Sequence, residues 1–170
     1  MKGFIYLGLI LVVGCSQPKQ GGLVYYNDCE TLKGWNTANI SNEQAHSGTY
    51  SNKLDSIHEY GLTLRQSFAE IANEKIKTIK VSVWVFIKPE TKGGMVLEVR
   101  NKDGKQILWD SQKTDKTNVV PNKWQFVTKD FVLNDSISKP ENTIAVYPWC
   151  SGKTEFYVDD IRIEFVTKIH

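Results

Sequence analysis

The sequence predicts an all-β protein built as a sandwich of two sheets, and three observations favour this fold class. Aromatic residues are numerous, because seven Phe, seven Tyr and five Trp stand beside only two Met. A chain rich in aromatic and β-branched residues is typical of strands rather than helices. Segments that alternate apolar and polar residues recur about every 8–12 residues, with turn residues between them, which indicates a β-sandwich.

The length and the charge of the chain bound its possible functions. One domain accounts for 170 residues better than two, because domains usually contain about 100–200 residues. With 41% hydrophobic residues and a formal net charge of +2, the chain is neither disordered nor a strongly electrostatic nucleic-acid binder. A binder of that kind needs a surplus of basic residues to displace counterions from phosphates. We therefore expect no nucleic-acid partner.

The N-terminal segment is expected to lie outside the folded domain. Residues 1–14 combine a basic start with an apolar stretch, 4–13, that is too short to span about 30 Å of hydrocarbon and is typical of a signal peptide. The sequence VVGCS at 12–16 resembles the bacterial lipobox, which implies lipidation of Cys15 and a lipidated tether over 15–22. Ser rather than Asp after the cysteine is similar to outer-membrane lipoproteins. The alternative is an ordinary signal peptide with a chance cysteine.

Two cysteines remain after the signal segment, Cys29 and Cys150. In an oxidising compartment, a disulfide between them would close a loop of roughly 120 residues and stabilise the fold by several kcal/mol. Two buried thiols are the alternative, given equal weight. No second Cys or His stands at metal-ligand spacing from either cysteine.

Eight strands and one short helix are predicted along the rest of the chain. The strands are expected over 49–54, 61–68, 80–88, 95–100, 106–110, 124–133, 143–149 and 155–165. The clearest of them, 80–88, is ended by a proline, and an Asp-Gly pair after 95–100 favours a hairpin. A helix is expected only within 67–75, where Ser67 and Glu70 stand at capping-box spacing.

Five short motifs occur in one order along residues 24–166. They are NDCE with GW at 27–35, AHSGTYS at 45–51, VSVWV at 81–85, KWQFV at 123–127 and FYVDDI at 156–161. Together they resemble the carbohydrate-binding modules of the cellulose- and xylan-binding jelly-roll type. The resemblance implies a jelly-roll β-sandwich of two antiparallel, galactose-binding-like sheets over 23–167. The sequence departs from the family pattern at Cys29, where the family usually has Phe.

Alternation within the strands divides their side chains between a core face and an outer face. In 80–88 the odd-numbered residues are all aliphatic and are expected to face the core. The residues expected to share one outer face are Trp84, Phe86, Glu98, Arg100, Tyr147 and Trp149. Pyranose rings lie with their C–H faces against aromatic planes, and their hydroxyls need polar partners. The sequence therefore predicts that this face binds a glycan.

The alternative is that these aromatic residues are covered by loops or by the N-terminal segment and complete a second core. Trp35 and Trp124 are assigned to the core, because they stand at the starts of strands rather than on an alternating polar face. Trp84 is weighed evenly between core and binding, and the face of Trp109 is ambiguous.

The resemblance also implies a structural calcium ion where the first strand, the turn after the first loop and the last strand meet. The residues that it implies as ligands are Glu30, Ser47, Thr49 and Asp160, with the backbone contributing around Ser47 and Thr49. Ca²⁺ binds about six to eight oxygen atoms, which carboxylates and carbonyls supply. The alternative is a pair of adjacent carboxylates balanced by lysines.

The sequence carries none of the common motifs of serine hydrolases, metalloproteases or nucleotide-dependent enzymes. Glu98 with Asp110 is the one carboxylate pair that could serve a glycosidase. We therefore expect no enzyme but a lipid-anchored outer-membrane lipoprotein that binds a poly- or oligosaccharide. A structural lipoprotein domain that docks on other outer-membrane proteins through the same aromatic face is the alternative, and a jelly-roll glycoside hydrolase stands third.

Overall fold

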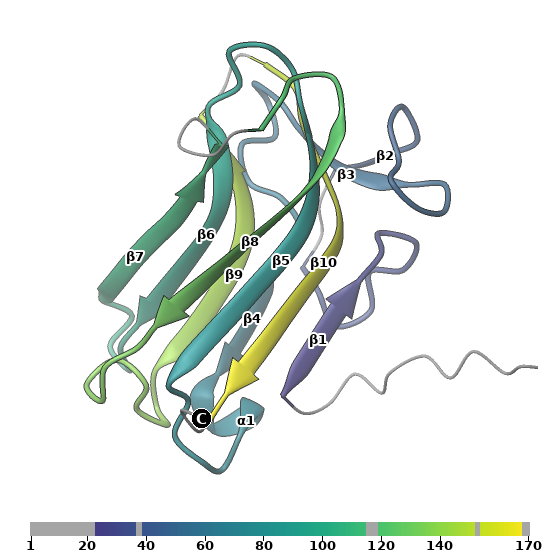
Figure 1. Cartoon of the computed structure of the whole chain (residues 1–170). Coiled ribbons are helices and arrows are strands. Elements are labelled where there is room, and N and C mark those ends of the chain that lie inside the picture. The colour runs from purple at the N-terminus through teal and green to yellow at the C-terminus, as the bar shows by residue number, and fades with distance from the viewer. Residues whose placement is uncertain (1–22, 37–38, 115–118, 152–153, 168–170) are drawn as a thin grey trace, which may run out of the picture.

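The computed structural model describes residues 23–36, 39–114, 119–151 and 154–167, which form a sandwich of two antiparallel β-sheets (Figure 1). The predicted fold class is confirmed. The predictions for the signal segment 1–14, for Cys15 and for the tether lie outside the described residues. Within those ranges, no helix has the length and apolar character needed to cross a membrane.

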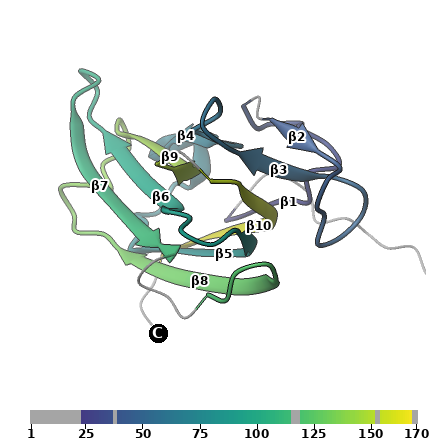
Figure 2. The same cartoon turned by 90° about the horizontal axis from the view of Figure 1, so that it is seen from above.

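Ten strands are described, divided between two layers (Figure 2). The six-stranded sheet contains β1 (Val24–Asn27), β2 (Ile40–Ser41), β3 (Ser51–Leu54), β5 (Thr78–Ile87), β8 (Trp124–Val132) and β10 (Phe156–Val166). Its order is β2-β3-β10-β5-β8, with β1 also paired to β10. The four-stranded sheet contains β4 (Leu64–Ser67), β6 (Gly93–Arg100), β7 (Gln106–Lys113) and β9 (Thr143–Cys150), in the order β4-β9-β6-β7.

All eight predicted strands occur with shifted ends, and the predicted helix is shorter than expected. Helix α1 covers only Phe68–Ile71, but its capping box is confirmed, since the Glu70 N–H donates to the Ser67 hydroxyl and the Ser67 N–H donates to the Glu70 carboxylate. The sequence missed β1 and β2. Both are too short to show an alternating pattern, and pairing with β10 and β3 determines their extended conformation.

The core lies between the two sheets and follows the predicted alternation. Val81, Val83 and Val85 of β5 are buried on the side that faces the other sheet. Leu97 of β6 and Val146 of β9 stand opposite each other in register, and both are buried on the side of their sheet that faces the six-stranded sheet. Two apolar faces thus meet, and removal of this apolar area from water stabilises the fold.

The prediction for Trp35 is confirmed and that for Trp124 is wrong. Trp35 is buried in the core. Trp124 stands opposite Phe86 in the β5–β8 register, and Val127 stands opposite the core residue Val83. Because side chains alternate along β8, Trp124 must point away from the core, and it is only half-buried.

A β-bulge in β10 changes which residues of this strand face the core. The register shifts after Asp159, and Asp160 adopts a left-handed φ of 50°. Val158 before the bulge and Ile161 after it are both buried in the core. Asp159 and Asp160 therefore both lie on the outer side of the six-stranded sheet.

Cys29 and Cys150 are buried thiols rather than the two halves of a disulfide. The Cys29 Sγ donates to the Val158 carbonyl, at 3.7 Å, and the Cys150 Sγ donates to the Thr154 carbonyl, at 3.5 Å. Of the two possibilities that the sequence left open, the structure has the thiols. Burial is the main reason that the pKa of the Cys29 thiol lies above its usual range.

Leu97→Ala tests the described core. The Leu97 side chain is fully buried between the sheets, and its truncation should lower the free energy of unfolding by about 2–5 kcal/mol. Urea denaturation of both proteins measures this difference. Val132→Ala, at an exposed apolar position, is the matched control and should change the free energy by less than about 0.5 kcal/mol. Equal losses in the two variants would contradict the assignment of Leu97 to the core.

A candidate binding cleft

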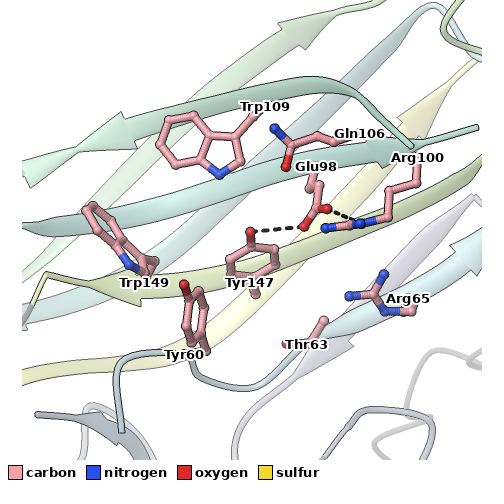
Figure 3. A pocket seen from close by; sticks show the side chains of 9 residues that line it. All are labelled: Tyr60, Thr63, Arg65, Glu98, Arg100, Gln106, Trp109, Tyr147 and Trp149. Carbon is pink, nitrogen blue, oxygen red and sulfur yellow. Dashed lines mark hydrogen bonds and ion pairs between the residues drawn. The ribbon is translucent and has the colours of Figure 1, made fainter. Parts of the chain in front are cut away.

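A cleft of about 460 Å³ lies on the outer face of the four-stranded sheet (Figure 3). Its floor contains a small group of buried residues, Val96, Ala145 and Tyr147, with Trp149 packed against them. The residues that line it are Tyr60, Thr63, Arg65, Glu98, Arg100, Gln106, Trp109, Tyr147 and Trp149.

Strand register explains why these side chains meet. Arg65 of β4 stands opposite Ala145 of β9, which stands opposite Glu98 of β6, which in turn stands opposite Trp109 of β7. The four residues form one row across the whole sheet, and all point outward because their neighbours in sequence face the core. Ala145 is the smallest member of the row, so the middle of the row is low and its ends are high.

Aromatic rings form one end of the cleft. The rings of Trp109 and Trp149 pack edge to face, with centroids 6.4 Å apart. Tyr60, on the loop before β4, forms an isolated bridge with Trp149 and packs its ring against that of Tyr147 at 5.9 Å. Tyr60 is 61% exposed and Trp109 is 42% exposed. Both therefore present apolar ring surface to whatever enters the cleft.

A buried carboxylate lies at the centre of the floor. Glu98 is only 6% exposed, and its Oε2 accepts a hydrogen bond of 3.2 Å from the Tyr147 hydroxyl. Its Oε1 forms an ion pair with the Arg100 Nε. Burial first, and Glu98 second, raise the pKa of Tyr147 to about 12. The tyrosine hydroxyl therefore stays protonated at neutral pH and acts as a donor.

This arrangement suits a polar ligand that also has flat apolar faces. Exposed rings at one end offer stacking surface. Glu98 can accept hydrogen bonds from hydroxyl groups, whereas Arg65 and Gln106 can donate them. Clefts of this size and mixed lining are typical of small-ligand sites.

The structure divides the six predicted binding residues between two sheets. Four of them line the cleft, namely Glu98, Arg100, Tyr147 and Trp149. Trp84 and Phe86 belong to β5, in the other layer, so the prediction of one shared face is wrong. Alternation assigns a residue to a face of its own strand, but it does not say which sheet that strand joins.

Sequence reasoning missed several residues of the cleft. Arg65 is an exposed polar residue beside the buried Leu64 in the short strand β4, and this alternation is a weak signal for an outward-facing side chain. Gln106 follows a register shift in the β6–β7 hairpin, which local alternation does not reveal. Tyr60 lies in a loop and offers no sequence signal at all, because only its bridge to Trp149 brings it to the site.

Trp84 and Phe86 form part of a second aromatic group, which a loop partly covers. The His46 ring stacks on Trp84, with centroids 3.7 Å apart and planes 14° apart. Trp124 packs against both Phe86 and His46, each at 5.7 Å. The alternative that a loop covers the aromatic side chains therefore describes Trp84, whereas Phe86 is buried against Trp124 and Tyr157 of the neighbouring strands. Phe126 also belongs to this group, because its ring packs against Trp84 with centroids 5.6 Å apart, but it is largely exposed, at 53%.

The residues implied as calcium ligands lie near one another, and some of their oxygen atoms accept hydrogen bonds from the protein. Glu30 Oε1 accepts the backbone N–H groups of Thr49 and Tyr50, at 2.7 and 2.8 Å. Ser47 donates its hydroxyl to Asp160 Oδ1, at 2.9 Å. Among the residues described, no group of three or more His, Cys, Asp or Glu side chains is arranged to hold a metal ion. Ca²⁺ binds about six to eight oxygen atoms, and a carboxylate oxygen that accepts a hydrogen bond can also bind a metal ion. The calcium site therefore stays a prediction.

The two aspartates on the bulge differ in electrostatic environment. Burial is the main cause that raises the pKa of Asp159 to about 6, although the backbone N–H groups of His46 and Ser47 donate to its Oδ2. Burial also acts on Asp160, but hydrogen bonds from Tyr26, His46 and Ser47 outweigh it and hold the pKa of this carboxyl below its usual value. Both carboxylates thus serve to fix the loop around His46.

The carboxylate pair considered for a glycosidase lies on opposite faces of the sheet. Glu98 stands opposite Trp109 in the register and points into the cleft, whereas Asp110 stands opposite the core residue Leu97. Asp110 forms an ion pair of 2.7 Å with Lys129 at the edge of the sandwich. A glycosidase needs both carboxylates beside the same bond, about 5–10 Å apart across the substrate. These two residues cannot act together.

Comparison with known proteins shows likeness in structure only. No family model and no curated protein sequence matches the chain. The C-terminal family 22 carbohydrate-binding module of Clostridium thermocellum Xyn10B is similar, with a TM-score of 0.62 and 19% identity over 91% of this chain and 100% of that chain. The CBM22-1 xylan-binding domain of Paenibacillus barcinonensis Xyn10C has a TM-score of 0.58 and 16% identity over 88% of this chain and 98% of that chain. These likenesses confirm the jelly-roll fold that the sequence motifs implied.

Treatment with a chelator tests whether calcium stabilises the domain. If calcium binds at Glu30 and Asp160 as the resemblance implies, the melting temperature should fall by several degrees in EDTA, because the two carboxylates lose the cation that joins them. Thermal melting followed by circular dichroism measures it, and addition of calcium after chelation is the control. A drop that calcium but not magnesium restores would support the predicted site, and an unchanged melting temperature would contradict it.

Proposed function

We propose that the protein binds a glycan non-catalytically in the cleft of the four-stranded sheet. The row from Arg65 through Ala145 and Glu98 to Trp109 carries the proposal, because it sets an exposed aromatic ring beside a buried carboxylate in one open cleft. Sugars present apolar C–H faces together with hydroxyl groups, and this pair of surfaces matches both.

The similar solved structures support the same ligand class. They include modules described as xylan-binding, and this chain covers nearly the full length of them. By analogy with these modules, we propose that the ligand of this protein is a polysaccharide chain. Their role as binding modules also supports a function without catalysis. Glu98 is the only carboxylate among the described residues that line the cleft, and hydrolysis of a glycosidic bond needs two.

A lipid anchor at Cys15 is the second part of the proposal. The apolar segment 4–13 followed by VVGCS supports it, together with the polar tether before the first strand. Each buried CH₂ of an acyl chain contributes about 0.8 kcal/mol, so two or more chains hold a protein stably on a membrane. The protein would then present its cleft to polysaccharide from the outer membrane.

Trp109→Ala and Tyr60→Ala test the cleft. Each removes an exposed ring, and loss of a ring that a ligand covers should weaken binding by about 1.5–3 kcal/mol, which is tenfold or more in Kd. Titration calorimetry and affinity electrophoresis on a xylan and glucan panel measure the change.

Phe126→Ala is the matched control for these variants. Phe126 is an equally exposed aromatic residue on the outer face of the other sheet, and its loss should leave the affinity unchanged. A larger effect of Phe126→Ala than of Trp109→Ala would place the site on the other sheet. A wild-type protein that binds no member of the panel would refute the proposed function and favour a protein partner.

Cys15→Ser tests the anchor. The wild-type protein should partition into the membrane fraction and incorporate labelled palmitate, whereas the variant should do neither, because it lacks the thiol that carries the lipid. Fractionation after expression in a bacterium with an outer membrane measures both. Equal membrane association of the two proteins, or no label in the wild type, would contradict the proposal.

A further inference from the structure

The charges that line the cleft do not cancel. Two guanidinium groups, Arg65 and Arg100, face one carboxylate, Glu98, and the other lining residues are uncharged. Arg100 forms the ion pair with Glu98 and also donates a hydrogen bond of 3.0 Å to the Gly104 carbonyl. In the described parts of the chain, the Arg65 side chain has no carboxylate within ion-pair distance. The cleft therefore carries one positive charge that the protein does not balance.

Strand register separates this charge from the aromatic end of the cleft. Arg65 stands opposite Ala145 and Arg100 stands opposite Thr143, whereas Trp149 lies four residues farther along β9 than Ala145. At about 3.3 Å per residue, this places Trp149 roughly 13 Å from Arg65 along the strands. Trp109 lies in the same row as Arg65, but about three strand spacings of 4.8 Å away across the sheet. Figure 3 shows both guanidinium groups on one side of Tyr147 and the Trp149 ring on the other.

Glu98 does not cancel the attraction of this end for an anion. Its charge is matched by Arg100, and the protonated Tyr147 hydroxyl donates to its other oxygen. An anionic group beside Arg65 thus meets a net positive field within the cleft. Field lines focused in a cleft raise the local concentration of an oppositely charged ligand.

We propose that the cleft takes an acidic glycan, whose sugar rings lie at the aromatic end and whose uronic-acid carboxylate pairs with Arg65. This inference rests on the proposed function and names its substrate class. A guanidinium presents planar, paired N–H donors that match the two oxygens of a carboxylate. The small side chain of Ala145, between Arg65 and Glu98, leaves room for the substituent to reach the guanidinium. A sulfate ester shares the anionic chemistry, and the experiment separates the two.

The experiment compares two oligosaccharides that differ in one charge. Xylotetraose is the neutral ligand, and xylotriose that bears a single methylglucuronic acid is the acidic ligand. Calorimetry on the full soluble domain, at low salt and at physiological salt, gives both affinities. For the wild type we expect about tenfold tighter binding of the acidic ligand at low salt and a smaller ratio at higher salt, because salt screens exposed charges.

Arg65→Gln should abolish this preference, so that the ratio of the two affinities falls to about one. Arg162→Gln removes the same charge from an exposed position on the outer face of the other sheet, and it should leave the ratio at about ten. This control separates a contact in the cleft from the general effect of net charge.

Each other outcome overturns part of the assignment. Equal affinities of the wild type for the two ligands would refute the inference while leaving glycan binding intact. A preference that persists in Arg65→Gln would exclude Arg65 as the carboxylate partner. A sulfated oligosaccharide that competes as well as the uronic acid would refute the carboxylate specificity. Binding of neither ligand would refute the proposed function itself.

Discussion

The bulge in β10 that leaves Asp159 and Asp160 side by side anchors the loop that covers part of one outer face of the sandwich. Core-facing residues continue on both sides of the bulge, so the two carboxylates point outward together. They accept hydrogen bonds from His46 and Ser47, and the loop that they hold places the His46 ring on Trp84. The outer face of the six-stranded sheet is covered at that point, while the outer face of the four-stranded sheet presents a cleft.

The two aromatic groups of this protein differ in how much of their ring surface the rest of the chain covers, and not in residue type. Trp84 is partly buried, and the imidazole of His46 that stacks on it removes part of its ring surface from water. Trp109 and Tyr60 keep much of their ring surface exposed at the rim of a hollow. A ligand that covers Trp109 and Tyr60 can therefore still gain free energy by removing their ring surface from water. At Trp84 most of this surface is already buried by folding.

The sequence predicted the fold class and the core faces of single strands, because alternation is a local property of the chain. The sequence did not predict the features that depend on which strands pair with one another. Trp84 and Tyr147 both alternate outward, yet their strands join different sheets, and only register shows this. Trp124 pairs with Phe86 on an outer face although it starts a strand in the way that core residues often do. A bulge, which inverts the alternation, likewise leaves no mark in the pattern.

The chemistry of Glu98 favours a hydroxyl-rich ligand over a protein surface. A carboxylate nine-tenths buried on an outer face is costly unless its oxygens find donors. The Tyr147 hydroxyl donates to Oε2, and Oε1 is ion-paired with the Arg100 Nε, so each oxygen keeps a second lone pair for another donor. An apolar partner that sealed the cleft would remove this ion pair from water and would supply no donor for the remaining lone pairs. A sugar hydroxyl can donate to one of these lone pairs, so a glycan replaces the water that it displaces from the buried carboxylate.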